Sequence, residues 1–259
     1  MHPVTVISFG LSIAALALHL APVSGLEPSR AQSTPHQHLV PKPEFLRAQG
    51  RFPRVRLAFA RQQDRLKSAF LHRGAVWPPR DLLLRAYKYE GELELYAAAK
   101  EPGARSLLVG VFPICAASGV LGPKRVEGDL QVPEGLYFID RFNPASRFHL
   151  SLGINYPNEA DRARRGDQNP GGDIFIHGGC ATVGCLPIGD DGIETLYVAA
   201  TLAKAYGQAQ IPVQILPCRF QQPHCAAALS QQSKEDAALE RFWRRLRHRI
   251  HGPDARAPI

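Results

Sequence analysis

A series of short apolar segments separated by turn-forming residues constrains the fold more than any other feature of the sequence. The segments LLLRAYKY (82–89) and ELELYAAA (92–99) flank Glu90-Gly91, a break typical of a β-hairpin. Further strand-like segments cover residues 106–114, 135–142, 148–157, 173–179 and 211–218. Many short strands at regular spacing predict a mainly β fold, either a mixed sheet or a β-sandwich. Leu93 and Leu95 alternate with Glu92 and Glu94, which predicts that one face of the sheet meets water.

Apolar residues at helical spacing predict three helices, over residues 53–73, 189–207 and 234–250. The first is interpreted as an N-terminal helical addition. Asp190 and Asp191 suit the start of the second, because acidic side chains favour the N-terminal turn of a helix. In the third, Leu239, Phe242, Trp243 and Leu246 form an apolar stripe that is expected to pack on the sheet.

The N-terminal residues 4–21 form an apolar run that is too short for a confident membrane span and fits the core of a signal peptide. The small residues Val23-Ser24-Gly25 suit a cleavage site, although no Lys or Arg precedes the run. Export to the periplasm is therefore expected, with an uncleaved membrane anchor as the alternative. The expected organisation is a signal peptide (1–25), a flexible linker (26–52), a helical addition (53–80), a catalytic domain (81–250) and a tail (251–259).

The chain carries a formal net charge of +8, with both signs mixed along it. No dense Lys/Arg run with interleaved aromatic residues occurs, so nucleic acid is not expected as a partner. A basic protein also suits an anionic cell envelope.

Residues 177–185, HGGCATVGC, place one histidine and two cysteines within a short stretch after an apolar segment. A zinc site is one interpretation, but the spacing is irregular and a second cysteine knuckle is absent, so no metal is expected. A disulfide between Cys180 and Cys185 is another, and it leaves His177 unexplained. The third makes Cys185 a nucleophile and His177 its base, since a neighbouring imidazolium increases the thiolate fraction. Amides at the Gly184 turn would then stabilise an oxyanion.

The segment IFIHGGCATVGCLPIGDDGIETLY (174–197) resembles the active site of the L,D-transpeptidase catalytic domain family (YkuD-type). It is most similar to the periplasmic YafK-like branch, which includes the peptidoglycan–lipoprotein amidase and shows HG-x-C-x-S-x-G-C followed by an acidic helix start. The likeness extends upstream through PIC (113–115), GPKRVEGD (122–129), PEGLY (133–137) and NYPNEAD (155–161), and covers about residues 80–247.

The resemblance implies that Cys185 attacks a carbonyl of meso-diaminopimelate in a peptidoglycan stem peptide and forms a thioester. His177 would accept the thiol proton, held by a backbone carbonyl near Gly178, and the Gly184 and Cys185 amides would bind the oxyanion. The acyl group would then pass to an amine or to water. No cofactor is implied. Carbapenem-type β-lactams become candidate covalent inhibitors, and an envelope lipoprotein becomes a candidate partner.

Two positions depart from the wider family pattern, because Val183 stands before Gly184-Cys185 and Pro187 stands two residues after the cysteine. The wider family usually has Arg or Asn at the position of Pro187, so any contact that such an arginine makes with the substrate must come from another residue. Candidates for binding the stem peptide are Lys124, Arg125, Arg162 and Thr182.

The five cysteines leave at least one thiol unpaired within the chain. Since Cys115 and Cys180 both lie in motifs that match the family, they are expected to lie close together near the site. Cys218 and Cys225 lie outside those motifs, and their short separation predicts a disulfide. Cys185 would then be the free thiol.

Two other functions compete with the cysteine transferase or amidase. One is a non-catalytic peptidoglycan-binding module of the same fold, which the retained His177 and Cys185 disfavour. The other is a papain-like protease, in which the cysteine precedes the histidine by a long interval, opposite to the order found here.

Overall fold

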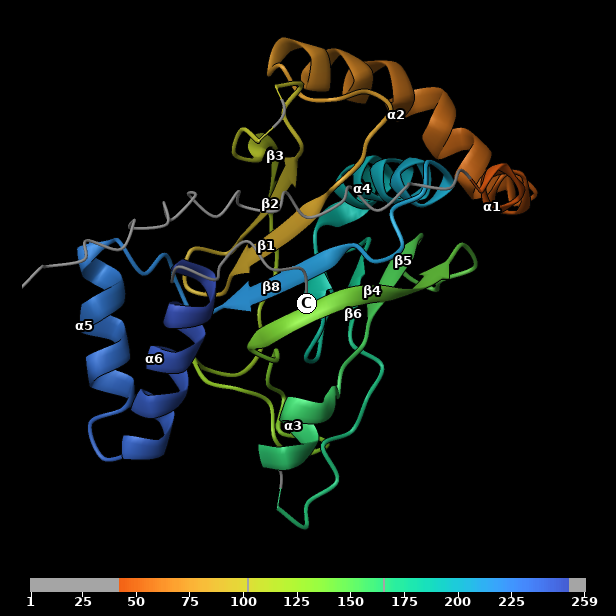
Figure 1. The fold of residues 1–259 in the computed structure, drawn as a ribbon. Helices are drawn as coiled ribbons and strands as arrows, with labels where there is room; N and C mark the ends of the chain where they lie inside the picture. Colours follow the sequence, from red (N-terminus) through yellow and green to blue (C-terminus); the bar gives the residue numbers. More distant parts are fainter. Residues whose placement is uncertain (1–41, 102, 165, 252–259) are drawn as a thin grey trace, which may run out of the picture. The chain divides into compact units, whose positions relative to one another are not determined.

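The computed structural model describes residues 42–101, 103–164 and 166–251. The predicted signal peptide, most of the predicted linker and the C-terminal residues 252–259 lie outside the described residues. One mixed sheet of eight strands forms the centre of the fold, in the order β3-β2-β1-β8-β4-β5-β6-β7 (Figure 1). The strands are β1 (Leu83–Tyr87), β2 (Glu92–Ala97), β3 (Leu107–Pro113), β4 (Gly135–Asn143), β5 (Ser151–Ile154), β6 (Phe175–His177), β7 (Leu186–Pro187) and β8 (Pro212–Leu216).

Six helices accompany the sheet in the described part of the chain. They are α1 (Pro43–Gln49), α2 (Pro53–His72), α3 (Glu159–Arg164), α4 (Gly189–Ala205), α5 (Pro223–Gln232) and α6 (Ala237–His251). The expected mixed sheet with N- and C-terminal helices is thus confirmed. The linker prediction omitted α1, whose first turn contains Pro43, and the sequence reasoning also missed α3 and α5. None of the described helices is long and apolar enough to cross a membrane.

Strand pairing follows the turn signals in the sequence. β1 and β2 are antiparallel across the Glu90-Gly91 turn, where Gly91 has a φ of 64°, a conformation that suits glycine. β8 joins the sheet between β1 and β4, parallel to the first and antiparallel to the second. At the far edge, β5 pairs antiparallel with β6, and β6 pairs parallel with β7. The candidate site therefore lies at the β7 edge of the sheet.

The main hydrophobic core lies between the sheet and the helices α2 and α4. Helix α4 is almost entirely buried, and α1 and α2 pack against it. On α2 the buried residues include Leu66 and Phe70, whereas Leu57 is 53% exposed. Because only one face of α2 contacts the protein, the buried residues recur every three or four positions and the opposite face is exposed. They are Val55, Ala58, Gln62, Leu66 and Phe70.

The predicted wet face of β2 is wrong at Glu94, which is only 6% exposed. Arg219, from the segment after β8, donates to Glu94 at 2.8 Å and to Glu92 at 2.6 Å. The Tyr96 hydroxyl donates to Glu94 at 2.6 Å. These hydrogen bonds compensate for the loss of water around the Glu94 carboxylate, so a buried acidic residue is tolerated at this position.

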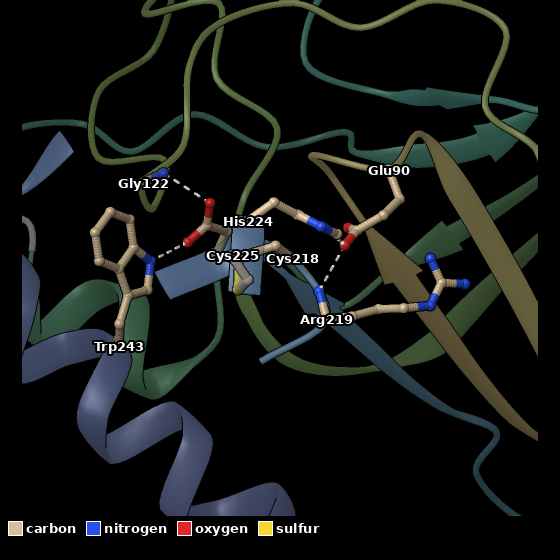
Figure 2. Close-up of a disulfide and its surroundings, with 8 residues drawn as sticks. Glu90, Gly122, Cys218, Arg219, His224, Cys225 and Trp243 are labelled. Atoms are coloured by element: carbon tan, nitrogen blue, oxygen red, sulfur yellow. Dashed lines mark hydrogen bonds and ion pairs between the residues drawn. A yellow bond between two sulfur atoms is a disulfide. The ribbon is translucent and has the colours of Figure 1, made fainter. Parts of the chain in front are cut away.

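A second, smaller core forms where α6 packs against the ends of β1 and β8. It contains the four residues of the predicted apolar stripe together with the Cys218–Cys225 disulfide, Tyr87 and Leu216. This confirms the expected packing of the C-terminal helix. Figure 2 shows the disulfide between Trp243 on one side and Glu90, Arg219 and His224 on the other.

A buried carboxylate joins this second core to the chain around the candidate site. Glu134 is fully buried and accepts hydrogen bonds from the Trp243 indole at 2.6 Å and the Gly122 amide at 2.7 Å. Lys88 pairs with it at 3.1 Å and also donates to the carbonyls of Val120, Gly122 and Val132. Burial lowers the pKa of Lys88, and the Glu134 carboxylate partly offsets that effect. The network therefore holds α6 and the 120–134 segment to β1.

Lys88→Met is expected to lower the free energy of unfolding by about 3–5 kcal/mol, because it leaves Glu134 buried without its counter-charge. Denaturant unfolding monitored by fluorescence measures the change. Lys67→Met, on the exposed face of α2, serves as the control and is expected to stay within about 0.5 kcal/mol of the wild type. A cost for Lys88→Met as small as that of the control would show that the network contributes nothing to stability.

Candidate active site

Cys185 ends the loop that joins β6 to β7, and its thiol is free. The next residue, Leu186, pairs with Ile176 of β6, so the cysteine lies beside Phe175. The Phe175 amide donates to the Cys185 sulfur at 3.4 Å, and the thiol is positioned to donate to the Asp173 carbonyl at 3.6 Å. Strand pairing thus sets the position of the sulfur. Both hydrogen bonds of the sulfur are with the segment that leads into β6.

His177 is the last residue of β6 and is buried, with 2% of its surface exposed. Its Nδ1 lies 2.6 Å from the carbonyl oxygen of Gly178, and its ring lies 4.6 Å from the Phe148 ring. A carbonyl can only accept, so Nδ1 carries the hydrogen and Nε2 keeps its lone pair. The histidine therefore has the tautomer that a general base acting through Nε2 requires.

Burial moves the pKa values of the two groups in opposite directions. Loss of water lowers the pKa of His177, and the Gly178 carbonyl partly offsets this. Loss of water also raises the pKa of Cys185, an effect that nearby Asp173 adds to and that the Phe175 amide and Lys124 oppose. Both shifts favour the neutral forms. The sequence argument had expected a neighbouring imidazolium to ionise the thiol, whereas burial in the structure acts in the opposite direction on both pKa values.

Two glycines allow the loop between the strands to pass through crowded space. A Cβ at Gly178 would lie 2.5 Å from Asp190 Oδ1 and 2.7 Å from the Phe148 carbonyl. Gly184 has a φ of 83°, and a Cβ there would lie 3.1 Å from the Gln131 carbonyl. Glycine is required at both positions, at the first for space and at the second for backbone conformation.

Further contacts fix the loop at its middle. Cys180 forms a disulfide with Cys115, and the Cys115 amide donates to the Pro187 carbonyl at 3.0 Å. The Gly179 amide donates to Asp190 Oδ1 at 2.8 Å, at the start of α4. The expected proximity of Cys115 and Cys180 is confirmed, as is the Cys218–Cys225 pair.

The two amides expected to bind an oxyanion already have hydroxyl acceptors. The Gly184 amide donates to Ser118 Oγ at 2.8 Å, and the Cys185 amide donates to Thr182 Oγ1 at 3.1 Å. The Thr182 hydroxyl also donates to the Cys185 carbonyl at 2.9 Å. Thr182, predicted to contact the substrate, therefore holds the backbone of the cysteine. Ser118 was missed because a serine in an Ala- and Gly-rich segment has no pattern that distinguishes it.

A small cavity of about 210 Å³ opens beside Cys185. Its walls are mostly apolar, with Ile114, Val132 and Leu186 among them, and Ser118 and Lys88 are its polar members. A second, larger cleft of about 750 Å³ contains Asp173, the residue whose carbonyl faces the thiol. The cysteine is therefore accessible from a hollow in the surface.

The predicted basic residues are not gathered around the sulfur. Lys124 is buried and pairs with Asp129 at 2.6 Å, although it is close enough to lower the pKa of Cys185. Arg125 is exposed, and its amide donates to Asp129. Arg162, on α3, donates to the Pro157 carbonyl and lines the larger cleft. In the described part of the chain, no group of three His, Cys, Asp or Glu side chains is arranged to bind a metal ion.

The unreduced, denatured protein is expected to react with one equivalent of a thiol reagent, and the reduced protein with five. In the native protein, alkylation of Cys185 by iodoacetamide should rise with pH with a midpoint higher than that of a free cysteine thiol, because burial raises the pKa of this thiol. Mass spectrometry of the alkylated peptide measures the rate. A midpoint below pH 7 would instead indicate a resting thiolate–imidazolium pair.

Thr182→Val is expected to lower the free energy of unfolding by about 1–3 kcal/mol, because it removes the acceptor of the Cys185 amide while keeping the side-chain volume. Thr182→Ser retains the hydroxyl and should stay close to the wild type. Denaturant unfolding of the two variants makes the comparison. Equal stabilities would show that the hydroxyl does not hold the cysteine backbone.

Sequence comparison finds similarity to "Putative L,D-transpeptidase YafK" of Escherichia coli strain K12 and of strain O157:H7. Each is 34% identical over 139 residues, which cover 53% of this chain and 54% of the relative. The chain thus matches about half the length of these curated relatives. No family model matches the chain.

Among solved structures, the helical cell shape determining protein Pgp2 of Campylobacter jejuni has a TM-score of 0.42 and 20% identity, covering 61% of this chain and 56% of that one. Bd1075 of Bdellovibrio bacteriovorus has a TM-score of 0.39 and 20% identity, covering 69% of this chain and 61% of that one. Because both scores are below 0.5, the structural likeness is partial. Over about half its length, the chain is homologous to proteins named as L,D-transpeptidases.

Proposed function

We propose that this protein is an exported cysteine acyltransferase or amidase that acts on meso-diaminopimelate amide links in peptidoglycan. The observation that carries the proposal is that two paired strands carry the two groups. A free cysteine directly precedes β7, and a histidine whose Nδ1 is held by a backbone carbonyl ends β6. Homology to a protein named as an L,D-transpeptidase supports the same chemistry. A peptidoglycan stem peptide is the proposed substrate, and the cavity beside Cys185 is its proposed entry.

In the first step the Cys185 sulfur attacks the carbonyl carbon, and the thiol proton passes to Nε2 of His177. Because the resting thiol is hydrogen-bonded to the Asp173 carbonyl, its hydrogen must turn from that oxygen towards the imidazole. The tetrahedral intermediate then breaks its C–N bond, and His177 returns the proton to the leaving amine. The product of this step is a thioester and a free amine.

The oxyanion of that intermediate needs hydrogen-bond donors. The Gly184 and Cys185 amides remain the proposed donors, but each must exchange a hydroxyl acceptor for the substrate oxygen. Ser118 Oγ occupies the acceptor position of the Gly184 amide and lines the same cavity, so its own O–H is available as a further donor. In the second step an amine or water attacks the thioester carbonyl, and His177 takes the proton of that acceptor. The C–S bond then breaks, and the released Cys185 sulfur recovers its proton from His177.

The acceptor decides between transpeptidation and hydrolysis. Hydrolysis or exchange at a lipoprotein–peptidoglycan amide is the finer proposal, with an envelope lipoprotein as the second partner. Incubation with muropeptides, with and without attached lipoprotein peptide, followed by mass spectrometry tests it: loss of the lipoprotein mass identifies hydrolysis, and a new amide identifies transfer. A non-catalytic binding module of the same fold would leave every mass unchanged.

A carbapenem is expected to form a covalent adduct at Cys185 that is visible by intact mass and absent in Cys185→Ala. His177→Gln should slow formation of the adduct by about 10²- to 10⁴-fold, because the thiol then lacks its base. Lys67→Met should react like the wild type. Absence of an adduct in the folded wild-type protein with a free Cys185 thiol would count heavily against the enzymatic function.

A further inference from the structure

The larger cleft, of about 750 Å³, combines both signs of charge next to the nucleophile. Asp140 and Arg141 come from β4, Glu159 and Arg162 from α3, and Asp173 from the segment before β6. Three carboxylates and two guanidinium groups therefore line one hollow. A site built for a simple anion or a simple cation would carry one sign only, whereas a zwitterion requires both.

The cleft is connected to Cys185 through the backbone. Asp173 lines the cleft, and its backbone carbonyl accepts a hydrogen bond from the Cys185 thiol at 3.6 Å. Arg141 lies 4.8 Å from the centre of the Phe175 ring, and the Phe175 amide donates to the Cys185 sulfur. A ligand group held in the cleft would therefore lie on the segment that positions the sulfur.

The charged groups of the cleft are free to exchange partners. Arg141 donates to Asp173 at 2.6 Å and to Asp140 at 3.2 Å, but Asp173 is 81% exposed and Arg141 is 42% exposed. Exposed ion pairs of this kind contribute little to stability. The Arg141 guanidinium group can therefore bind a carboxylate of a ligand in the bidentate geometry that it favours. The two aspartates released from Arg141 can then bind an ammonium group of the same ligand.

The backbone at Asp173 has a φ of 56°, a left-handed conformation that residues other than glycine rarely adopt. Aspartate and asparagine are among the side chains that tolerate it best. Asp173→Asn therefore removes the charge with little change in backbone preference, which makes it a suitable test variant.

We propose that this cleft binds an unreacted α-amino acid group, with an ammonium and a carboxylate on one carbon, belonging to the substrate acylated at Cys185. The inference rests on the proposed function, since meso-diaminopimelate carries such a group at the end distant from the attacked carbonyl. Arg141 would bind its carboxylate, and Asp140 and Asp173 would bind its ammonium. When this amine is acylated in a cross-link, it becomes a neutral amide and loses the contact with the aspartates. The cleft would therefore select stem peptides that are not cross-linked.

Binding of small probes to full-length Cys185→Ala tests the cleft without requiring catalysis. The probes are meso-2,6-diaminopimelate, pimelate and 1,5-diaminopentane. They share a five-carbon segment whose two ends carry both charges, only carboxylates or only ammonium groups, respectively. Calorimetry or NMR titration should show diaminopimelate binding at least about tenfold more tightly than either single-charge probe. Adding Arg141→Gln or Asp173→Asn should abolish that preference, and adding Arg244→Gln, from an exposed ion pair on α6, should leave it intact.

Equal binding of the three probes, or an unchanged preference in both cleft variants, would overturn the proposal.

Kinetics on muropeptides provides the second measurement. The wild type should favour stems with a free amine over the acetylated stem through a lower KM, and Arg141→Gln should remove the difference. A protein that binds diaminopimelate selectively yet forms no carbapenem adduct and changes no muropeptide would refute the proposed enzyme while retaining the cleft as a binding site.

Discussion

The candidate site depends on the parallel pairing of two very short strands, β6 and β7, at the edge of the sheet. That pairing closes the 178–185 loop, sets the Cys185 sulfur against the Phe175 amide and leaves His177 at the end of the neighbouring strand. Two-residue β7 cannot hold such a register alone. The Cys115–Cys180 disulfide, the Asp190 contact with Gly179 and the two crowded glycines supply the remaining constraints.

The chemistry of the site follows from burial combined with selective hydrogen bonding. Water is removed from both the thiol and the imidazole, so each prefers its neutral form at rest. The Gly178 carbonyl fixes the imidazole tautomer without an acidic partner, which keeps a second negative charge away from the sulfur. In the proposed mechanism charge then develops only during attack, when the Gly184 and Cys185 amides exchange their hydroxyl acceptors for the substrate oxygen.

The two cores of the protein are linked through buried polar groups rather than through continuous apolar packing. Glu134 accepts from Trp243 and Gly122 and pairs with Lys88, which itself borders the cavity beside Cys185. Lys88 therefore both helps to hold the C-terminal helix and lines the cavity of the candidate site. Ser118 lines the same cavity and accepts from the Gly184 amide, so the second core and the cavity beside Cys185 are connected.

Local pattern in the sequence was enough to predict the hairpin at Gly91, the long helices and the α6 stripe, because strand alternation and helical spacing are short-range properties. Motif spacing likewise identified His177 and Cys185 as the candidates for catalysis. Tertiary structure decided the rest. Glu94 is buried because Arg219, distant in sequence, crosses its strand, and Thr182 binds backbone because the loop folds back on itself. Arg141 and Asp173 meet only through the pairing of strands, so their cleft beside the sulfur could not be read from the order of residues.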